Sequence, residues 1–145
     1  SVARLAVEDT AAWVQALRDA DLVWIESPSN PLLDVADLAT IGAAERDPGT
    51  RLVVDNTFAT PLNQRPLERG ADIVVHSATK FIGGHSDLLC GIAVARNGQL
   101  AEQLRRSRSV NGATASLDRS SSSRMLATAK RPRSAGTSGM PPTSR

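Results

Sequence analysis

Three polar residues that could take part in chemistry follow three successive apolar runs of the sequence. Asn30, Asp55 and Lys80 are spaced 25 residues apart, and each follows a short stretch rich in Val, Ile or Leu. Such stretches are typical of strands that are buried on both faces of a sheet. In an open α/β sheet, ligands bind beyond the carboxyl ends of the strands. One strand–helix unit per step would therefore bring these three side chains to the same rim.

These residue types match the requirements of pyridoxal phosphate (PLP) chemistry. A lysine amine can hold the cofactor as a Schiff base and act as nucleophile and base, which is the role expected of Lys80. A carboxylate must face the pyridine nitrogen and keep it protonated, and Asp55 fits that role. An amide beside the phenolic oxygen would orient the ring, as Asn30 could. Ser77 and Thr79 flank the lysine and could receive the phosphate.

Each of these residues also has a simpler interpretation. Lys80 could be a surface lysine at the end of a strand. Asp55 could cap the turn that follows it at residues 56–57. Ser77 and Thr79 could be ordinary strand residues. Each residue means little alone, and only their common position beyond the strands makes a site plausible.

The elements that would position these residues alternate along the chain. The expected strands are Leu22–Ile25, Leu52–Val54, Ile73–Val75 and Leu88–Val94, and the expected helices are Asp9–Ala20, Asp34–Arg46, Leu62–Arg69 and Gln99–Arg108. This rhythm predicts an α/β domain over residues 1–115, with a mostly parallel sheet and flanking helices. Four strands make a small sheet for that architecture, so a piece of a larger domain is expected.

The charge of the chain is unevenly distributed. The net charge is +2, but residues 1–115 carry 11 basic and 14 acidic residues, whereas residues 116–145 carry 6 and 1. The second segment has four consecutive serines and no sustained apolar period, so we expect a disordered basic tail. Its abrupt onset favours a reading-frame change or an artificial end over a designed tail. Without aromatic platforms the tail predicts weak attraction to polyanions and no specific nucleic-acid binding.

The remaining sequence features bear on compartment and metal binding. A single cysteine, Cys90, excludes an internal disulfide framework and fits a reducing cytoplasm. No apolar run is long enough for a membrane span, and the first residues lack the layout of a signal peptide. The start has no initiator Met and is typical of an internal segment. His76 and His85 lack a third ligand at zinc-site spacing, which favours packing or hydrogen bonding over metal binding.

Three strings of the sequence resemble the Cys/Met-metabolism PLP-dependent enzymes. They are ESPSNPLL (26–33), VVDNTFATP (53–61) and ADIVVHSATKFIGGHSD (71–87). That family includes cystathionine γ-synthase, cystathionine γ-lyase, methionine γ-lyase and the O-acylhomoserine sulfhydrylases. The similarity extends from about Leu22 to Thr114, and the block around SATK is long and specific.

The resemblance implies a fold and a set of site residues. The fold would be part of the large PLP-binding domain of the aminotransferase-like fold type I. Lys80 would hold PLP and move protons, and Asp55 would pair with the pyridinium nitrogen. Asn30 would contact the oxygen side of the ring, and Ser77 and Thr79 would bind the phosphate. Family members are usually homotetramers built from dimers that complete each other's sites.

The resemblance also implies trans-sulfuration of a sulfur amino acid or an activated homoserine. A γ-substituent leaves, and then either a thiol adds or the product is eliminated as a 2-oxo acid. The cystathionine γ-synthase/γ-lyase branch is favoured, with the methionine γ-lyase/sulfhydrylase branch as the alternative. A further alternative is an inactive fragment that at most binds PLP. Family members are much longer, with a ring-stacking tyrosine and a carboxylate-binding arginine in a C-terminal domain, and this sequence contains no tyrosine.

Overall fold

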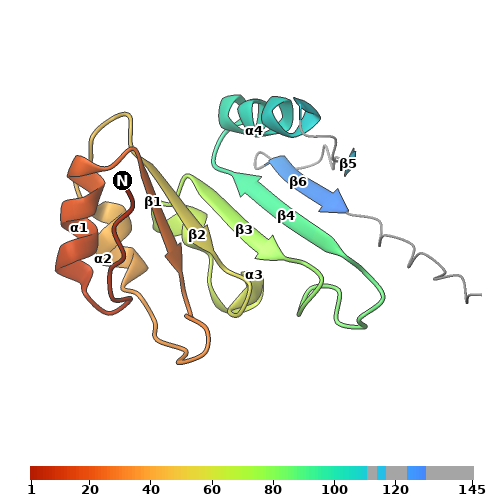
Figure 1. Ribbon diagram of the computed structural model, residues 1–145, viewed down its shortest axis with the longest axis horizontal. Coiled ribbons are helices and arrows are strands. Elements are labelled where there is room, and N and C mark those ends of the chain that lie inside the picture. The colour runs from red at the N-terminus through yellow and green to blue at the C-terminus, as the bar shows by residue number, and fades with distance from the viewer. Residues whose placement is uncertain (111–113, 117–123, 130–145) are drawn as a thin grey trace, which may run out of the picture.

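The computed structural model describes residues 1–110, 114–116 and 124–129, whose strands form one six-stranded sheet with helices beside it (Figure 1). The strands are β1 (Leu22–Glu26), β2 (Arg51–Asp55), β3 (Ile73–Ser77), β4 (Cys90–Ala95), β5 (Thr114–Ser116) and β6 (Arg124–Ala129). The helices are α1 (Thr10–Asp19), α2 (Leu38–Ala43), α3 (Thr60–Asn63), the 3₁₀ helix η1 (Pro66–Arg69) and α4 (Gly98–Val110). None of the described helices is both long and apolar enough to span a membrane. The predicted α/β class is confirmed.

The sheet is mixed, with the strand order β1-β2-β3-β4-β6-β5. Strands β1, β2 and β3 run parallel, and Asp55 at the end of β2 pairs with Glu26 on one side and Val75 on the other. The remaining pairings are antiparallel. Parallel pairing therefore extends over the first three strands only. Residues 78–89, which join β3 to β4, contain no helix, and a parallel return needs a crossover of about a dozen residues or more, usually a helix.

Strand β6 lies inside the segment 116–145, for which the sequence predicts disorder. It pairs with β4 over its whole length, from Arg124 opposite Ala95 to Ala129 opposite Cys90. The prediction therefore does not hold at residues 124–129. Without this partner the edge of β4 would present a row of unpaired backbone N–H and C=O groups. Strand β6 pairs these groups through its own backbone, and such pairing does not require a regular pattern of apolar side chains. Residues 117–123 and 130–145 lie outside the described part of the chain, and the division at residue 115 stays a prediction.

The hydrophobic core lies between the parallel strands and helices α1 and α2. The buried residues of this core are Trp13, Leu17, Val23, Ile25, Ala36, Leu38, Ile41, Leu52, Val54, Ala71 and Val74. Val54 and Val74 pair in register within this core. Because side chains alternate across a strand, their successors Asp55 and Val75, and Ser77 beyond them, face away from α1 and α2. Packing of the apolar face thus decides which face carries the candidate site.

Two helices begin at aspartates that cap them. Asp9 caps α1 through its side chain, which accepts a hydrogen bond from the N–H of Ala12 at 3.0 Å. Helix α2 begins after Asp37, whose carboxylate accepts hydrogen bonds from the hydroxyl and backbone N–H of Thr40 at 2.6 and 3.0 Å. These bonds hold the pKa of Asp37 below its usual value. The predicted helix start at Asp34 is wrong, because Asp34 instead bonds the hydroxyl of Ser29 through its backbone N–H at 3.0 Å and closes a loop.

Helix α2 and the 3₁₀ helix η1 approach each other closely. A Cβ on Gly42 would collide with the backbone carbonyl of Arg69, and Gly70 adopts a positive φ of 101°. The helix predicted after β2 is split into α3 and η1. Pro66 restricts the residue before it to extended conformations, and Arg65 has φ −123° and ψ 81°. These close contacts set the position of the segment that follows β2.

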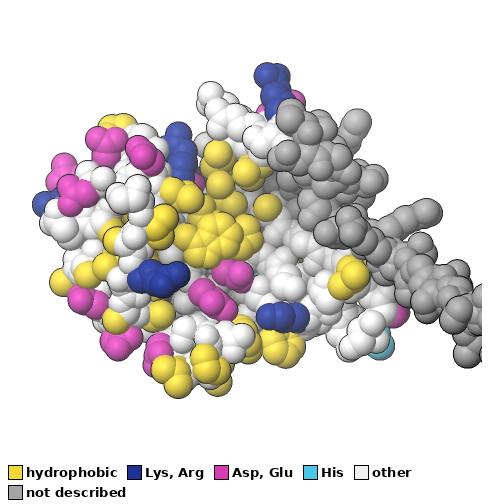
Figure 2. Space-filling model, viewed as in Figure 1, with side chains coloured by type: hydrophobic (Ala, Val, Ile, Leu, Met, Phe, Trp, Pro, Cys, Tyr) yellow, Lys and Arg dark blue, Asp and Glu magenta, His cyan; other side chains and the backbone are white. Residues whose placement is uncertain are grey.

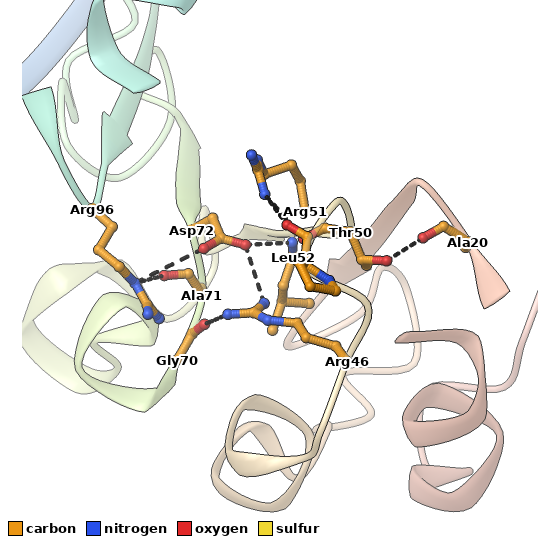
Figure 3. Close-up of polar contacts among 10 residues, drawn as sticks. Ala20, Arg46, Thr50, Arg51, Leu52, Gly70, Ala71, Asp72 and Arg96 are labelled. Carbon is orange, nitrogen blue, oxygen red and sulfur yellow. Dashed lines mark hydrogen bonds and ion pairs between the residues drawn. The ribbon is translucent and has the colours of Figure 1, made fainter. Parts of the chain in front are cut away.

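The amino ends of the strands are joined by a charged cluster around Asp72 (Figure 3). Asp72 Oδ2 accepts hydrogen bonds from the backbone N–H of Leu52 at 2.9 Å and from Arg46 at 3.1 Å. Its Oδ1 lies 4.0 Å from Nε of Arg96. Arg46 also donates to the carbonyl oxygen of Gly70 at 3.0 Å. The cluster fixes the start of β2, the start of β3 and the end of β4 relative to one another.

Candidate functional site

Asp55 ends strand β2 and is half-buried at the carboxyl end of the sheet. Its Oδ1 accepts hydrogen bonds from the backbone N–H of Thr57 at 3.0 Å and from Thr57 Oγ1 at 2.6 Å. The carboxylate therefore caps the turn after β2, as its simpler interpretation holds. Oδ2 makes no hydrogen bond within the part of the chain that the structure describes. One oxygen serves the turn, and the other remains able to accept a hydrogen bond from a ligand.

Thr57 connects Asp55 to the end of the neighbouring strand. While its hydroxyl donates to Asp55, the same oxygen accepts a hydrogen bond from the backbone N–H of Ser77 at 2.8 Å. The carbonyl oxygen of Ser77 in turn accepts from the backbone N–H of Lys80 at 3.0 Å. A continuous chain of hydrogen bonds thus leads from the Asp55 carboxylate to the Lys80 backbone.

The Lys80 side chain is exposed at this rim, above an aromatic pair. Its Nζ lies 5.4 Å from the centroid of the Phe58 ring, within the range of a cation–π contact. Phe58 and Phe81 pack edge to face, with ring centroids 5.7 Å apart and planes at 61°. The backbone of Lys80 is held in a turn, because its carbonyl accepts from the N–H of Gly84 at 2.8 Å. The amine is therefore accessible on a fixed backbone.

The hydroxyls of the two predicted phosphate ligands differ in their surroundings. Thr79 Oγ1 accepts from the backbone N–H of Cys90 at 2.8 Å and donates to the Cys90 carbonyl at 3.3 Å, so it ties the turn to the start of β4. The Ser77 hydroxyl makes no hydrogen bond to the described residues and faces the same side of the sheet as Asp55. Only Ser77 therefore offers a hydroxyl that is not already engaged.

Asn30 is the candidate residue on the loop that follows β1. It is exposed within this loop, which spans residues 27–37. Its neighbour Ser29 holds this loop through hydrogen bonds with Asp34, and Ser29 Oγ accepts from the Asp34 N–H at 3.0 Å. Because β1 and β2 are parallel neighbours, the loop begins at the same rim as Asp55. No hydrogen bond joins the Asn30 side chain to Asp55 or Lys80 among the described residues, so its role stays a prediction.

His76 is the buried titratable group nearest to this rim. Its side chain is 5% exposed, and Nδ1 has no hydrogen-bond partner among the described residues. Burial lowers the pKa of His76 below its ordinary value of 6.5, and the negative charge of Asp55 partly opposes this shift. Residues 1–107 hold no group of three or more His, Cys, Asp or Glu side chains that could bind a metal ion. His76 therefore packs within the described chain with one ring nitrogen unpaired.

Sequence reasoning missed the contribution of Thr57 and Phe58. They are the second and third residues after Asp55, and Thr57 entered the prediction only as part of a turn. The available signal was their position, because a tight turn after a strand places its next residues at the rim beside the strand end. Thr57 relays between two strands and Phe58 lies under the Lys80 amine.

Relatives with known names match more than half of the chain. Cystathionine γ-synthase/O-acetylhomoserine (thiol)-lyase of Bacillus subtilis is 52% identical over 82 residues, which is 57% of this chain and 22% of the relative. Cystathionine β-lyase of Coxiella burnetii is 53% identical over 95 residues, covering 65% of this chain and 24% of the relative. The chain thus spans about a quarter of the length of these relatives.

The fold also matches a solved structure of the same kind. The crystal structure of cystathionine γ-synthase from Xanthomonas oryzae in complex with cystathionine superposes with a TM-score of 0.67 at 45% identity, covering 73% of this chain and 28% of that one. A family model described as Cys/Met metabolism PLP-dependent enzyme matches residues 2–125. That range contains strands β1 to β5, the hydrogen bonds that connect Asp55, Thr57, Ser77 and Lys80, and the exposed amine described above. The chain belongs to the family of Cys/Met-metabolism PLP-dependent enzymes.

Proposed function

We propose that this chain is the PLP-binding part of a trans-sulfuration enzyme and that Lys80 carries the cofactor. Asp55 would bind the pyridine nitrogen, Asn30 the oxygen side of the ring, and Ser77 and Thr79 the phosphate. The observation that carries this proposal is the placement of Asp55 and Lys80. Asp55 ends β2, and Lys80 lies three residues beyond the end of its parallel neighbour β3. Hydrogen bonds through Thr57 and Ser77 connect them, one carboxylate oxygen has no hydrogen bond to the described chain, and the amine is exposed over Phe58.

The residues present fit the chemical demands of this cofactor. Bound PLP supplies an electron sink for the α-carbon of an amino acid. Asp55 Oδ2 would keep the ring nitrogen protonated while Thr57 holds Oδ1 in place. The Lys80 amine, on its fixed backbone, would bond the cofactor and then accept and return protons at the substrate carbons. The Ser77 hydroxyl would donate to the phosphate directly. Thr79 would first have to release its hydrogen bond to the Cys90 carbonyl.

The proposed substrate is a sulfur amino acid or an activated homoserine, transformed by γ-replacement or γ-elimination. This rests on the names of the matching relatives, which are cystathionine γ-synthase, cystathionine β-lyase and cystathionine γ-lyase. A methionine γ-lyase or O-acylhomoserine sulfhydrylase reaction is the alternative within the family. The proposal extends to a cytoplasmic homotetramer for a protein of the relatives' full length.

A second proposal concerns the chain of 145 residues by itself. Because it spans about a quarter of the length of the relatives it matches, we propose that it binds PLP without completing turnover. The two proposals share the cofactor site and differ only in activity. Incubation with PLP and cystathionine, followed by an assay for 2-oxo acid and thiol products, separates them.

The cofactor site is tested by chemical trapping. The purified chain is mixed with PLP, reduced with borohydride to fix the cofactor on the amine that holds it, digested and mapped. The chain has only two lysines, Lys80 and Lys130, and Lys130 lies outside the described residues. We expect label on Lys80 at low PLP concentration and only trace label on Lys130. Equal labelling of both lysines, or label on Lys130 alone, would contradict the assignment.

A further inference from the structure

Two side-chain amides, those of Asn56 and Gln64, form a closed hydrogen-bonded pair behind the candidate site. Gln64 Nε2 donates to Asn56 Oδ1 at 2.8 Å and to the carbonyl oxygen of Ser27 at 2.8 Å. Asn56 Nδ2 donates to the carbonyl oxygens of Gln64 and Thr60 at 2.8 and 3.2 Å. All four amide hydrogens are therefore used, and each goes to a different acceptor.

This amide pair holds the backbone on both sides of the Asp55 carboxylate. The Ser27 carbonyl is bound by Gln64, while the N–H of the same residue donates to the carbonyl oxygen of Asp55 at 3.2 Å. The next residue, Asn56, donates its own N–H to the carbonyl of Val75 at 2.9 Å. The main chain of residues 55–56 is thus hydrogen-bonded to Ser27, the first residue after β1, and to Val75 in β3. Gln64 in turn binds the carbonyl oxygen of Ser27.

Gln64 is half-buried, but two of the groups that it binds belong to the buried residues Asn56 and Ser27, where water cannot easily replace a lost hydrogen bond. Asn56 is 1% exposed and Ser27 is fully buried, with its hydroxyl accepting from the N–H of Ala36 at 3.0 Å. Loss of one donor from such a network leaves a buried acceptor unpaired, which costs more than the net value of an average hydrogen bond. The arrangement at Asp55 therefore has one preferred geometry.

We propose that Gln64 is a positioning residue that sets the Asp55 carboxylate for the pyridine nitrogen of the cofactor. The inference rests on the function proposed above, because it assumes that Asp55 meets that nitrogen. Gln64 would act through the Ser27 carbonyl and the Asn56 side chain, and not by touching the ring. Its loss should weaken the interaction of Asp55 with the ring nitrogen, and should leave interactions of the phosphate and the aldehyde unchanged.

The experiment compares Gln64→Met, which has similar length and no donor, with Gln99→Met as a matched control on the exposed surface of α4. The aldehydes are PLP and its carbocyclic analogue, in which C–H replaces the ring nitrogen. The measured quantity is the aldehyde concentration that gives half-maximal labelling of Lys80. We expect Gln64→Met to raise it about 10-fold for PLP, the equivalent of one hydrogen bond in such a network. For the analogue we expect less than a twofold change, and the control should match the unchanged chain with both.

A purely structural role for Gln64 predicts a different result. It would weaken labelling by PLP and by the analogue equally, and that outcome would overturn the inference while leaving the proposed function intact. Equal behaviour of Gln64→Met and Gln99→Met with PLP would also overturn it. If the unchanged chain fails to label at Lys80 at all, the proposed function itself is overturned, and the inference with it.

A second variant tests the need for a donor at position 64 and guards against misfolding of Gln64→Met. In Gln64→Glu the ionised carboxylate cannot donate, but its protonated form regains one O–H donor, and burial raises the pKa of such a group. The PLP concentration for half-maximal labelling of Lys80, divided by that of the unchanged chain, should therefore decrease as the pH is lowered from about 8 to about 6. His76 and Asp55, the titratable groups around the pair, are present in both chains and cancel in the ratio. A ratio that stays constant or increases as the pH is lowered contradicts the inference.

Amide hydrogen exchange without any aldehyde provides an independent measurement. Gln64→Met should speed exchange at the N–H groups of Ser27 and Asn56 relative to Gln99→Met. Exchange at Leu52, whose N–H is bound by Asp72 at the other end of the strand, should not change. Unchanged exchange at Ser27 and Asn56 would show that Gln64 does not hold the Asp55 backbone.

Discussion

The two ends of the parallel strands use aspartates in opposite ways. At the amino end, Asp72 is surrounded by Arg46, Arg96 and the backbone N–H of Leu52, and these contacts involve both of its carboxylate oxygens (Figure 3). At the carboxyl end, Asp55 engages one oxygen with Thr57 and keeps the other free of hydrogen bonds to the described chain. The amino end is satisfied by the chain itself, whereas the carboxyl end retains groups that can bind a ligand.

The surroundings of the carboxyl end fit this difference. The segments that follow β1, β2 and β3 expose large apolar side chains, namely Leu32, Leu33, Val35, Leu62, Phe81, Ile82, Leu88 and Leu89. Figure 2 shows hydrophobic side chains gathered along the lower edge of the view, where these strands end. A mostly apolar lining with a few convergent polar groups is typical of small-molecule sites. Charge alone therefore does not distinguish the two ends, whereas polar atoms without a partner in the described chain do.

Replacement of the reactive amine should have the largest effect. Lys80→Arg keeps the charge and the contact with Phe58, but a guanidinium stays protonated and cannot bond an aldehyde. Specific labelling by PLP should disappear in this variant and persist in Lys130→Arg, the change at the other lysine of the chain. Trapped cofactor that remains at the same peptide in Lys80→Arg would remove this residue from the site.

The two aspartates provide the sharpest test of the comparison. Asp72→Asn leaves Arg46 and Arg96 without their carboxylate, and we expect it to lower the free energy of unfolding by about 2 kcal/mol. Asp55→Asn keeps an acceptor for Thr57, so stability should change by less than about 0.5 kcal/mol while the PLP concentration for labelling of Lys80 rises. Urea unfolding and trapping are measured on both variants. A large loss of stability in Asp55→Asn would show that Asp55, like Asp72, mainly stabilises the fold, and would contradict the difference between the two ends.

The two hydroxyls beside Lys80 divide in the same manner. Thr79→Val removes the hydroxyl but preserves shape, so the N–H of Cys90 loses its partner and stability should fall by about 1 kcal/mol. Ser77→Ala removes a hydroxyl without a partner in the described chain, so it should affect PLP binding and leave the unfolding midpoint nearly unchanged. Chemical denaturation and PLP titration distinguish the two variants. If Thr79→Val weakened PLP binding and left stability unchanged, the Thr79 hydroxyl would serve the ligand and not the turn.

The pH dependence of stability should carry the smallest signal. Because burial lowers the folded pKa of His76 below 6.5, the unfolded chain binds more protons as the pH falls below that value. Stability is therefore unaffected by this group well above pH 6.5 and decreases as the pH falls towards the lowered folded pKa. We expect the unfolding free energy to decrease between pH 7.5 and 5.5, with a smaller slope in His76→Gln. An identical slope in both chains would exclude His76 as its source.

The class of fold and much of the site could be predicted from local sequence patterns. The apolar runs before Asp55 and Lys80 identified strands β2 and β3, and the match of the family model to residues 2–125 confirms the resemblance. The direction of β4 and the pairing of residues 124–129 could not be predicted. Both depend on which strand edge is unpaired after the first three strands assemble. The local pattern of apolar residues does not show which edge that is.

The amino-acid sequence establishes the residue types and their order, namely a lysine, a carboxylate and two hydroxyls at or just beyond the ends of strands, together with the family to which they belong. Which atoms of these residues are hydrogen-bonded became visible in the fold alone. There, Thr57 binds one oxygen of Asp55, Cys90 binds the hydroxyl of Thr79, and Gln64 binds Ser27 and Asn56 on either side of Asp55. The reason is physical, because hydrogen bonds at the strand ends join segments far apart in the chain, and their partners are chosen only when the sheet brings those segments together.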